Sequence, residues 1–295
     1  MSNPAHRAIS LGRITALTSN TLTELTRLKL FYFLLLFALL LIGSSAFMAR
    51  LSFQQEFQVL KDISLGAMSI FTSILAIVAA ARMLPQDLED RTIYTILAKP
   101  VSRFEYLVGK LAGVLLLLLI STVVMTLLFC VALFLREHAA LAEVTRQMSG
   151  APAEQLQEAL QGVRNSTFNA DLVPGIAIIY LKASLLASLT LFISTFATTN
   201  IFTIVVTVFV YFIGHIQGTA REFWLQQSGG TTVARVFLAF VALVFPDLQL
   251  FDFADDLVAG AAVPLSVFAN AAGFGCFYTV LYLLLATAVF SGREL

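Results

Sequence analysis

Long apolar runs separated by shorter polar stretches dominate the pattern along this chain. A hydrocarbon core of about 30 Å needs roughly 20 apolar residues per helix, since each residue adds about 1.5 Å. Six runs meet this length, and they predict membrane-spanning helices at residues 30–48, 63–84, 106–135, 173–197, 201–216 and 264–290. A further apolar run at residues 233–245 is too short to cross and fits a re-entrant or interfacial segment.

Composition supports a membrane protein. Hydrophobic residue types make up 59% of the 295 residues and charged types only 12%, which is far from the balance of a water-soluble fold. We therefore expect an all-α membrane protein with one transmembrane domain over residues 1–295. Between and around its spans we expect an N-terminal tail and interfacial helix (1–29), a cytoplasmic loop (85–105), and outer loops (136–172 and 217–263) with short re-entrant half-helices.

The distribution of charge predicts the orientation of these spans. If the N-terminus faces the cytosol, Lys and Arg outnumber Asp and Glu on that side, whereas acids outnumber bases on the other. Basic residues near span ends favour the cytosolic side. We expect a multi-pass protein of the cytoplasmic (inner) membrane, surrounded by lipid, with both termini in the cytosol. The net charge of zero gives no reason to expect a nucleic-acid partner.

The loop between the second and third spans has the most informative pattern. Pro85 is expected to open a helix and Pro100 to close it, with acidic residues in the first turns, where the helix dipole favours them. Apolar residues at helical spacing predict an amphipathic helix at the cytoplasmic interface. The next helix is expected to begin near Ser102, with Arg103 and Lys110 at headgroup level. A basic, lipid-binding connector is the simpler interpretation, but a connector does not need a proline-bounded helix.

The stretch RTIYTILAKPVSRFEYLVGKLAG in this loop resembles the signature of ABC-2 permeases, the membrane subunits of one class of ATP-binding-cassette (ABC) transporter. The resemblance implies that the loop helix is a coupling helix, which docks into a separate ATPase subunit of an exporter. The residues to which it assigns ATPase coupling are Asp87, Glu89, Asp90, Arg91, Thr92, Leu97, Pro100, Ser102, Arg103, Gly109 and Lys110.

The resemblance also implies partners. They are an ABC ATP-binding subunit and a second permease copy, in a homodimer or a paired permease. ATP and Mg²⁺ would be bound by the ATPase subunit, and no cofactor by this chain. The sequence agrees, because no G-x-x-x-x-G-K-[ST] motif occurs in it.

One charge falls inside a predicted span. Lys182 lies well within the fourth span, where a charged side chain costs at least about 2.5–3.5 kcal/mol on insertion scales. Two interpretations stay open: Lys182 lines a cavity and meets an anionic group of a substrate, or its long stem reaches an interface. His138 and His215 lie at or beyond span ends, where a solvated histidine is the ordinary case, and no metal site is expected.

Other classes of function have weaker support. A membrane enzyme or scaffold without transport activity is the alternative, but an enzyme needs converging nucleophiles, acids or metal ligands, and we expect no catalytic residue. The one acidic group, at Asp247, Asp252, Asp255 and Asp256, is better explained as a solvated outer loop. A secondary transporter usually shows an internal repeat and several intramembrane ionisable groups, and neither is visible here.

Overall fold

The structure is a computed structural model, and it describes residues 10–48, 56–89, 101–150, 152–168, 171–227, 245–252 and 264–292. All regular elements in these ranges are helices. In chain order they are α1 (Leu11–Thr26), α2 (Lys29–Met48), α3 (Glu56–Glu89), α5 (Arg103–Gln147), α6 (Ala153–Thr167), α7 (Leu172–Ser194), α8 (Asn200–Gln227), the 3-10 turn η2 (Gln249–Phe251) and α11 (Leu265–Ser291).

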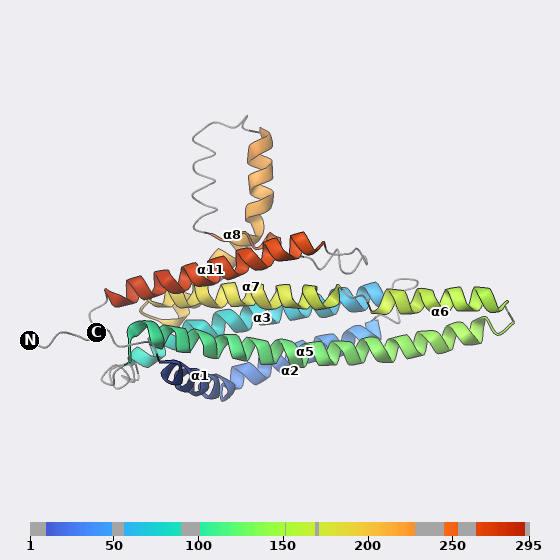
Figure 1. The fold of residues 1–295 in the computed structure, drawn as a ribbon, viewed down its shortest axis with the longest axis horizontal. Coiled ribbons are helices and arrows are strands. Elements are labelled where there is room, and N and C mark those ends of the chain that lie inside the picture. The colour runs from blue at the N-terminus through green and yellow to red at the C-terminus, as the bar shows by residue number, and fades with distance from the viewer. Residues whose placement is uncertain are drawn as a thin grey trace, which may run out of the picture.

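Most of the long helices run side by side along one axis, whereas α8 turns away from that direction (Figure 1). The central helix is α7, which contacts α3, α5, α8 and α11. Its buried side chains extend around the whole helix rather than along one face, as expected of a helix enclosed by neighbours. The end of α3, the start of α5, α1 and the end of α11 lie together at one end of the bundle (Figure 1).

Six of the described helical stretches are long and apolar enough to cross a membrane. They lie in α2, α3, α5, α8 and α11, and in the stretch that ends with α7. Many large apolar side chains on these helices are exposed, for example Phe33 at 64% and Phe209 at 65%. Such side chains are stable in lipid and costly in water. The prediction of an all-α membrane protein is therefore confirmed.

Helix α5 is much longer than a bilayer requires, and with α6 it forms a hairpin that extends beyond the other helices (Figure 1). The base of this hairpin is tied to α3 by polar contacts. Arg136 of α5 pairs with Glu56, and the ammonium of Lys61 donates a hydrogen bond to the carbonyl of Ser166 at 2.8 Å. A cation at the C-terminal end of a helix, where carbonyls lack partners, is favourable.

The structure differs from the expected start of the loop helix. Pro85 does not open a new helix, because α3 continues through it to Glu89. A proline inside a helix removes one backbone hydrogen bond and strains the preceding turn, so another interaction must hold this segment. Asp87, two residues further on, supplies it: this carboxylate is 6% exposed and is bound by two side chains of α5.

Candidate functional site

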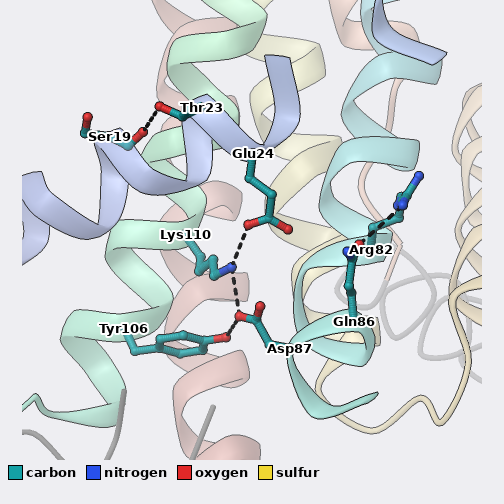
Figure 2. Close-up of polar contacts among 8 residues, drawn as sticks. All are labelled: Ser19, Thr23, Glu24, Arg82, Gln86, Asp87, Tyr106 and Lys110. Carbon is teal, nitrogen blue, oxygen red and sulfur yellow. Dashed lines mark hydrogen bonds and ion pairs between the residues drawn. The ribbon is translucent and has the colours of Figure 1, made fainter. Parts of the chain in front are cut away.

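A cluster of polar side chains joins three helices next to the connection between α3 and α5. We call it the joint cluster; it consists of Glu24 of α1, Asp87 of α3, and Tyr106 and Lys110 of α5. The ammonium of Lys110 lies 2.8 Å from a carboxylate oxygen of Asp87 and 3.5 Å from one of Glu24. The Tyr106 hydroxyl donates a hydrogen bond to Asp87. Figure 2 shows Lys110 between the two acids.

Burial makes the joint cluster strong. Tyr106 is fully buried and Lys110 is 2% exposed, so water screens their charges little. Asp87 accepts from a cation and a hydroxyl at once, which is the condition under which a buried carboxylate is tolerated. Lys110 pairs at short range with two acids, and its side chain is enclosed by the protein. The cluster therefore fixes the end of α3 against α5.

The start of α5 is fixed to α1 by a second acid. Ser102 and Glu105 form a capping box, in which the Ser102 hydroxyl accepts from the Glu105 amide at 3.1 Å and the Glu105 carboxylate accepts from the Ser102 amide at 2.9 Å. The other oxygen of this carboxylate accepts from the Ser10 amide at 2.8 Å and pairs with Arg13 at 2.9 Å. One buried carboxylate thus caps α5 and binds the N-terminal end of α1.

Two glycines let α1 lie directly on α5. A Cβ atom at Gly109 would be 2.6 Å from Cβ of Leu17, and one at Gly113 would be 2.6 Å from Cβ of Thr21. No side chain fits at such distances. The Thr18 hydroxyl, between them on α1, reaches the carbonyl of Gly109 at 3.3 Å. Gly109 of the loop signature therefore serves helix packing in the described structure.

Arg103 connects the start of α5 to the end of α11. Its guanidinium donates hydrogen bonds to the carbonyls of Phe290 and Ser291, at 2.5 and 2.9 Å, and lies 5.6 Å from the centre of the Phe290 ring. The last carbonyls of a helix lack intrahelical partners, so a cation placed there stabilises the helix end. Four helices, α1, α3, α5 and α11, are thus joined around the first two turns of α5.

The structure places only some of the signature residues. Asp87, Ser102, Arg103, Gly109 and Lys110 lie in or beside the contacts above, and Glu89 is exposed at the end of α3. The remaining ones lie outside the described residues, as does most of the expected coupling helix. They are Asp90, Arg91, Thr92, Leu97 and Pro100.

A second polar cluster lies in the middle of the bundle. We call it the Lys182 cluster; it consists of Ser69 of α3, Lys182 of α7, and Tyr211 and His215 of α8. The Lys182 ammonium is 3.0 Å from Nε2 of His215, 3.4 Å from the Ser69 hydroxyl and 5.6 Å from the centre of the Tyr211 ring. Lys182 is 3% exposed, so its side chain points into the protein.

His215 was interpreted as a solvated histidine at a span end, and this was wrong. It lies inside α8 and is only partly exposed, with one ring nitrogen on Lys182 and the other 3.0 Å from the carbonyl of Tyr211. The sequence offered a signal, because Tyr211 and His215 are four residues apart and share a helix face. What it did not show is that this face meets Lys182.

Glu105 is another residue that the sequence interpretation left without a role. Its signal was present, since a serine followed three residues later by a glutamate is typical of a capping box. Its pairing with Arg13 depends on how α1 packs, which no local pattern indicates. For metals, the described residues contain no group of three or more His, Cys, Asp or Glu side chains placed to hold an ion.

Helices of bilayer length, joined by buried ion pairs and capping contacts at one end of the bundle, define a multi-pass membrane protein. The chain belongs to the ABC-2 transporter family: residues 24–295 match the family described as "ABC-2 family transporter protein". This confirms the resemblance seen in the loop. Such proteins are membrane permease components of ABC transporters without an ATPase site of their own, which implies an ABC ATP-binding partner. The search of curated proteins found no match.

Proposed function

We propose that this chain is the permease subunit of an ABC exporter in the cytoplasmic membrane. It works as a homodimer or with a paired permease, and a separate subunit hydrolyses ATP. The coupling loop between α3 and α5 faces the cytosol and receives the movement of that subunit. The family supports the permease role; the coupling role is argued from the joint cluster.

The observation that carries this proposal is the position of the joint cluster. Residues 90–100 connect α3 to α5, so a force on this segment acts first on the ends of those two helices. Lys110 forms ion pairs with Asp87 of α3 and Glu24 of α1. Arg103 donates hydrogen bonds to the end of α11. Close-packed protein interiors deform little and transmit strain. A displacement of the loop would therefore tilt several helices together.

The geometry divides the signature residues into two roles. Asp87, Lys110 and Gly109 face other helices of this chain, so we assign them to transmission within the permease. Glu89 is exposed at the end of α3, so we assign it, with the residues at 90–100, to the contact with the ATPase subunit. Exposed residues at an interface contribute to association without being needed for folding.

The test compares two exposed glutamates at opposite ends of the bundle. Glu89→Ala should weaken copurification with the ATP-binding subunit about tenfold, equivalent to about 1.4 kcal/mol, and should lower ATP hydrolysis by the complex. Glu154→Ala, on α6, removes the same charge from the far hairpin and should change neither quantity. Equal copurification of the two variants would overturn the assigned docking site.

The orientation is tested with the same two positions. In a variant without Cys130 and Cys276, a membrane-impermeant maleimide added to intact cells should label Glu154→Cys, whereas Glu89→Cys should be labelled only after the membrane is opened. Labelling of Glu89→Cys in intact cells would place the loop on the wrong side for an ATPase and overturn the proposal.

A further inference from the structure

Lys182 carries a charge that the described part of the protein does not neutralise at short range. Its contacts are a hydroxyl, an imidazole nitrogen and an aromatic ring. No carboxylate in the described residues lies within ion-pair distance of its ammonium; the ion pairs found there involve Arg13, Lys110 and Arg136. Burying a charge without an opposite charge is costly. A charge of this kind inside a membrane bundle usually marks a functional site, such as a substrate or ion pathway.

The hydrogen bonds indicate how Lys182 and His215 share their protons. Nδ1 of His215 lies 3.0 Å from the carbonyl of Tyr211, and a carbonyl only accepts, so Nδ1 carries the proton. Nε2 then accepts from the Lys182 ammonium at 3.0 Å. If a proton of the ammonium moves to Nε2, His215 carries the positive charge and Lys182 becomes neutral. With Lys182 protonated, the pair holds one positive charge in both arrangements, which matches one anionic group.

The surroundings of the site indicate what carries that anionic group. Lys182 is buried, whereas Ser69 and Tyr211 at its sides are partly exposed, so the ammonium lies one side chain below the surface of the bundle. On the same part of α3, Ile70 and Ile74 are 53% and 38% exposed, so the outer surface of the helix is apolar there. An alkyl chain is stable against this apolar surface. An amphiphile with an anionic headgroup fits both the buried ammonium and the apolar surface.

A segment that is distant in sequence from Lys182 lies beside this site. At residues 245–252, the Leu248 amide donates a hydrogen bond to the carbonyl of Gly214 at 3.0 Å, one residue before His215. A Cβ atom at Gly214 would be 2.8 Å from both Leu248 Cγ and the Pro246 carbonyl oxygen, so the segment packs directly on α8. Two carboxylates of this segment act electrostatically on the site: the exposed Asp252 on Lys182, His215 and Tyr211, and the buried Asp247 on His215.

We propose that Lys182, with Ser69, Tyr211 and His215, binds the anionic headgroup of an amphiphile, a phosphate or carboxylate group on an apolar chain. Asp252 supplies the distant negative charge when the site is empty, and it competes with the ligand. This inference rests on the proposed function only where it takes the bound amphiphile to be the exported molecule; binding itself requires neither ATP nor the ATPase subunit.

The experiment measures binding of dodecyl phosphate to the purified permease in dodecyl maltoside, by native mass spectrometry across a concentration series. Lys182→Met should weaken binding about tenfold or more, since a charge-assisted hydrogen bond is lost. Lys61→Met is the matched control: Lys61 is also a buried lysine, 2% exposed, but its ammonium already binds the Ser166 carbonyl. Lys61→Met should bind dodecyl phosphate as tightly as the unmodified protein does. Asp252→Asn should bind more tightly, because the competing charge is gone.

Three results would overturn the inference. Equal binding by Lys182→Met and Lys61→Met would show that Lys182 is not in the site. Weaker or unchanged binding by Asp252→Asn would remove the competing role of Asp252. Inorganic phosphate that displaces dodecyl phosphate at equal concentration would identify a site for small anions. ATP hydrolysis by the complex is measured separately, so a failure of coupling leaves these binding results intact.

Discussion

Two buried lysines, Lys110 and Lys182, differ in how their charges are held. Their exposed fractions are nearly the same, 2% and 3%. Lys110 lies between two carboxylates from two other helices, whereas Lys182 lies against a hydroxyl, an imidazole and a ring. Among the described residues, the lysine at the end of the bundle has carboxylates at ion-pair distance, whereas Lys182 has none.

The difference separates two uses of a buried charge. Removing one partner from a compensated pair leaves the other charged and buried, so such a pair holds helices in place. A charge with only neutral partners contributes little to holding helices, yet it attracts an anion strongly because its own desolvation has already occurred. We expect the joint cluster to dominate stability and the Lys182 cluster to dominate binding.

Lys110→Met tests the first half of this comparison and should have the largest effect. It removes the Lys110 ammonium from Asp87, which is 6% exposed. Breaking a buried pair in this way costs about 3–5 kcal/mol. The thermal unfolding midpoint of the protein in detergent micelles should fall clearly.

The double variant Asp87→Asn with Lys110→Met serves as the control for that loss. It removes both charges, so it should regain part of the lost stability, and the non-additivity measures the coupling of the pair. The single variant Asp87→Asn is measured as well. If the loss of stability in the double variant equals the sum of the losses in Lys110→Met and Asp87→Asn, Lys110 and Asp87 do not act together.

Gly113→Ala should have the next largest effect, through the packing of α1 on α5. The added Cβ would lie 2.6 Å from Cβ of Thr21, so α1 must move, and overpacking typically costs about 1–3 kcal/mol. Gly66→Ala in α3 is the matched control, because its Cβ would have no neighbour within 4 Å. There the better helix propensity of alanine should raise stability slightly. Equal changes in the two unfolding midpoints would contradict close packing of α1.

Local patterns in the sequence were enough to predict the class of fold. Hydrophobic run length predicts spans because lipid thickness sets the length of a helix, and the six membrane-length stretches agree with this. Pro85 shows where local reasoning fails. Its lack of an amide proton predicts a helix start, but the helix continues because Asp87 binds Lys110 and Tyr106 on another helix. Tertiary contacts overrode the local preference.

The two clusters could be predicted only in part. Lys182 was recognised because a charge inside an apolar run is rare, and Lys110 because it belongs to the loop signature. Their partners come from other helices: His215 lies 33 residues from Lys182, and Glu24 lies 86 residues from Lys110. Such pairings depend on how helices face one another. A single sequence does not contain that information in any local pattern.

Glu24→Gln tests the weaker arm of the joint cluster and should have a small effect. Its carboxylate is 36% exposed and lies 3.5 Å from the Lys110 ammonium, so water screens the pair, and exposed pairs contribute about 0–1 kcal/mol. The unfolding midpoint should fall slightly, and less at high salt. A loss as large as that of Lys110→Met would show that Glu24, and not Asp87, is the main partner of Lys110.

Lys182→Met should have the smallest effect on stability, although it removes the same kind of side chain at nearly the same burial as Lys110→Met. No carboxylate in the described residues loses a short-range partner, and methionine fills much of the same volume. Replacing a buried charge with an apolar side chain is often neutral or stabilising, so the unfolding midpoint should be unchanged or higher. A fall as large as that of Lys110→Met would mean that Lys182 is compensated after all, and the distinction between the two clusters would be lost.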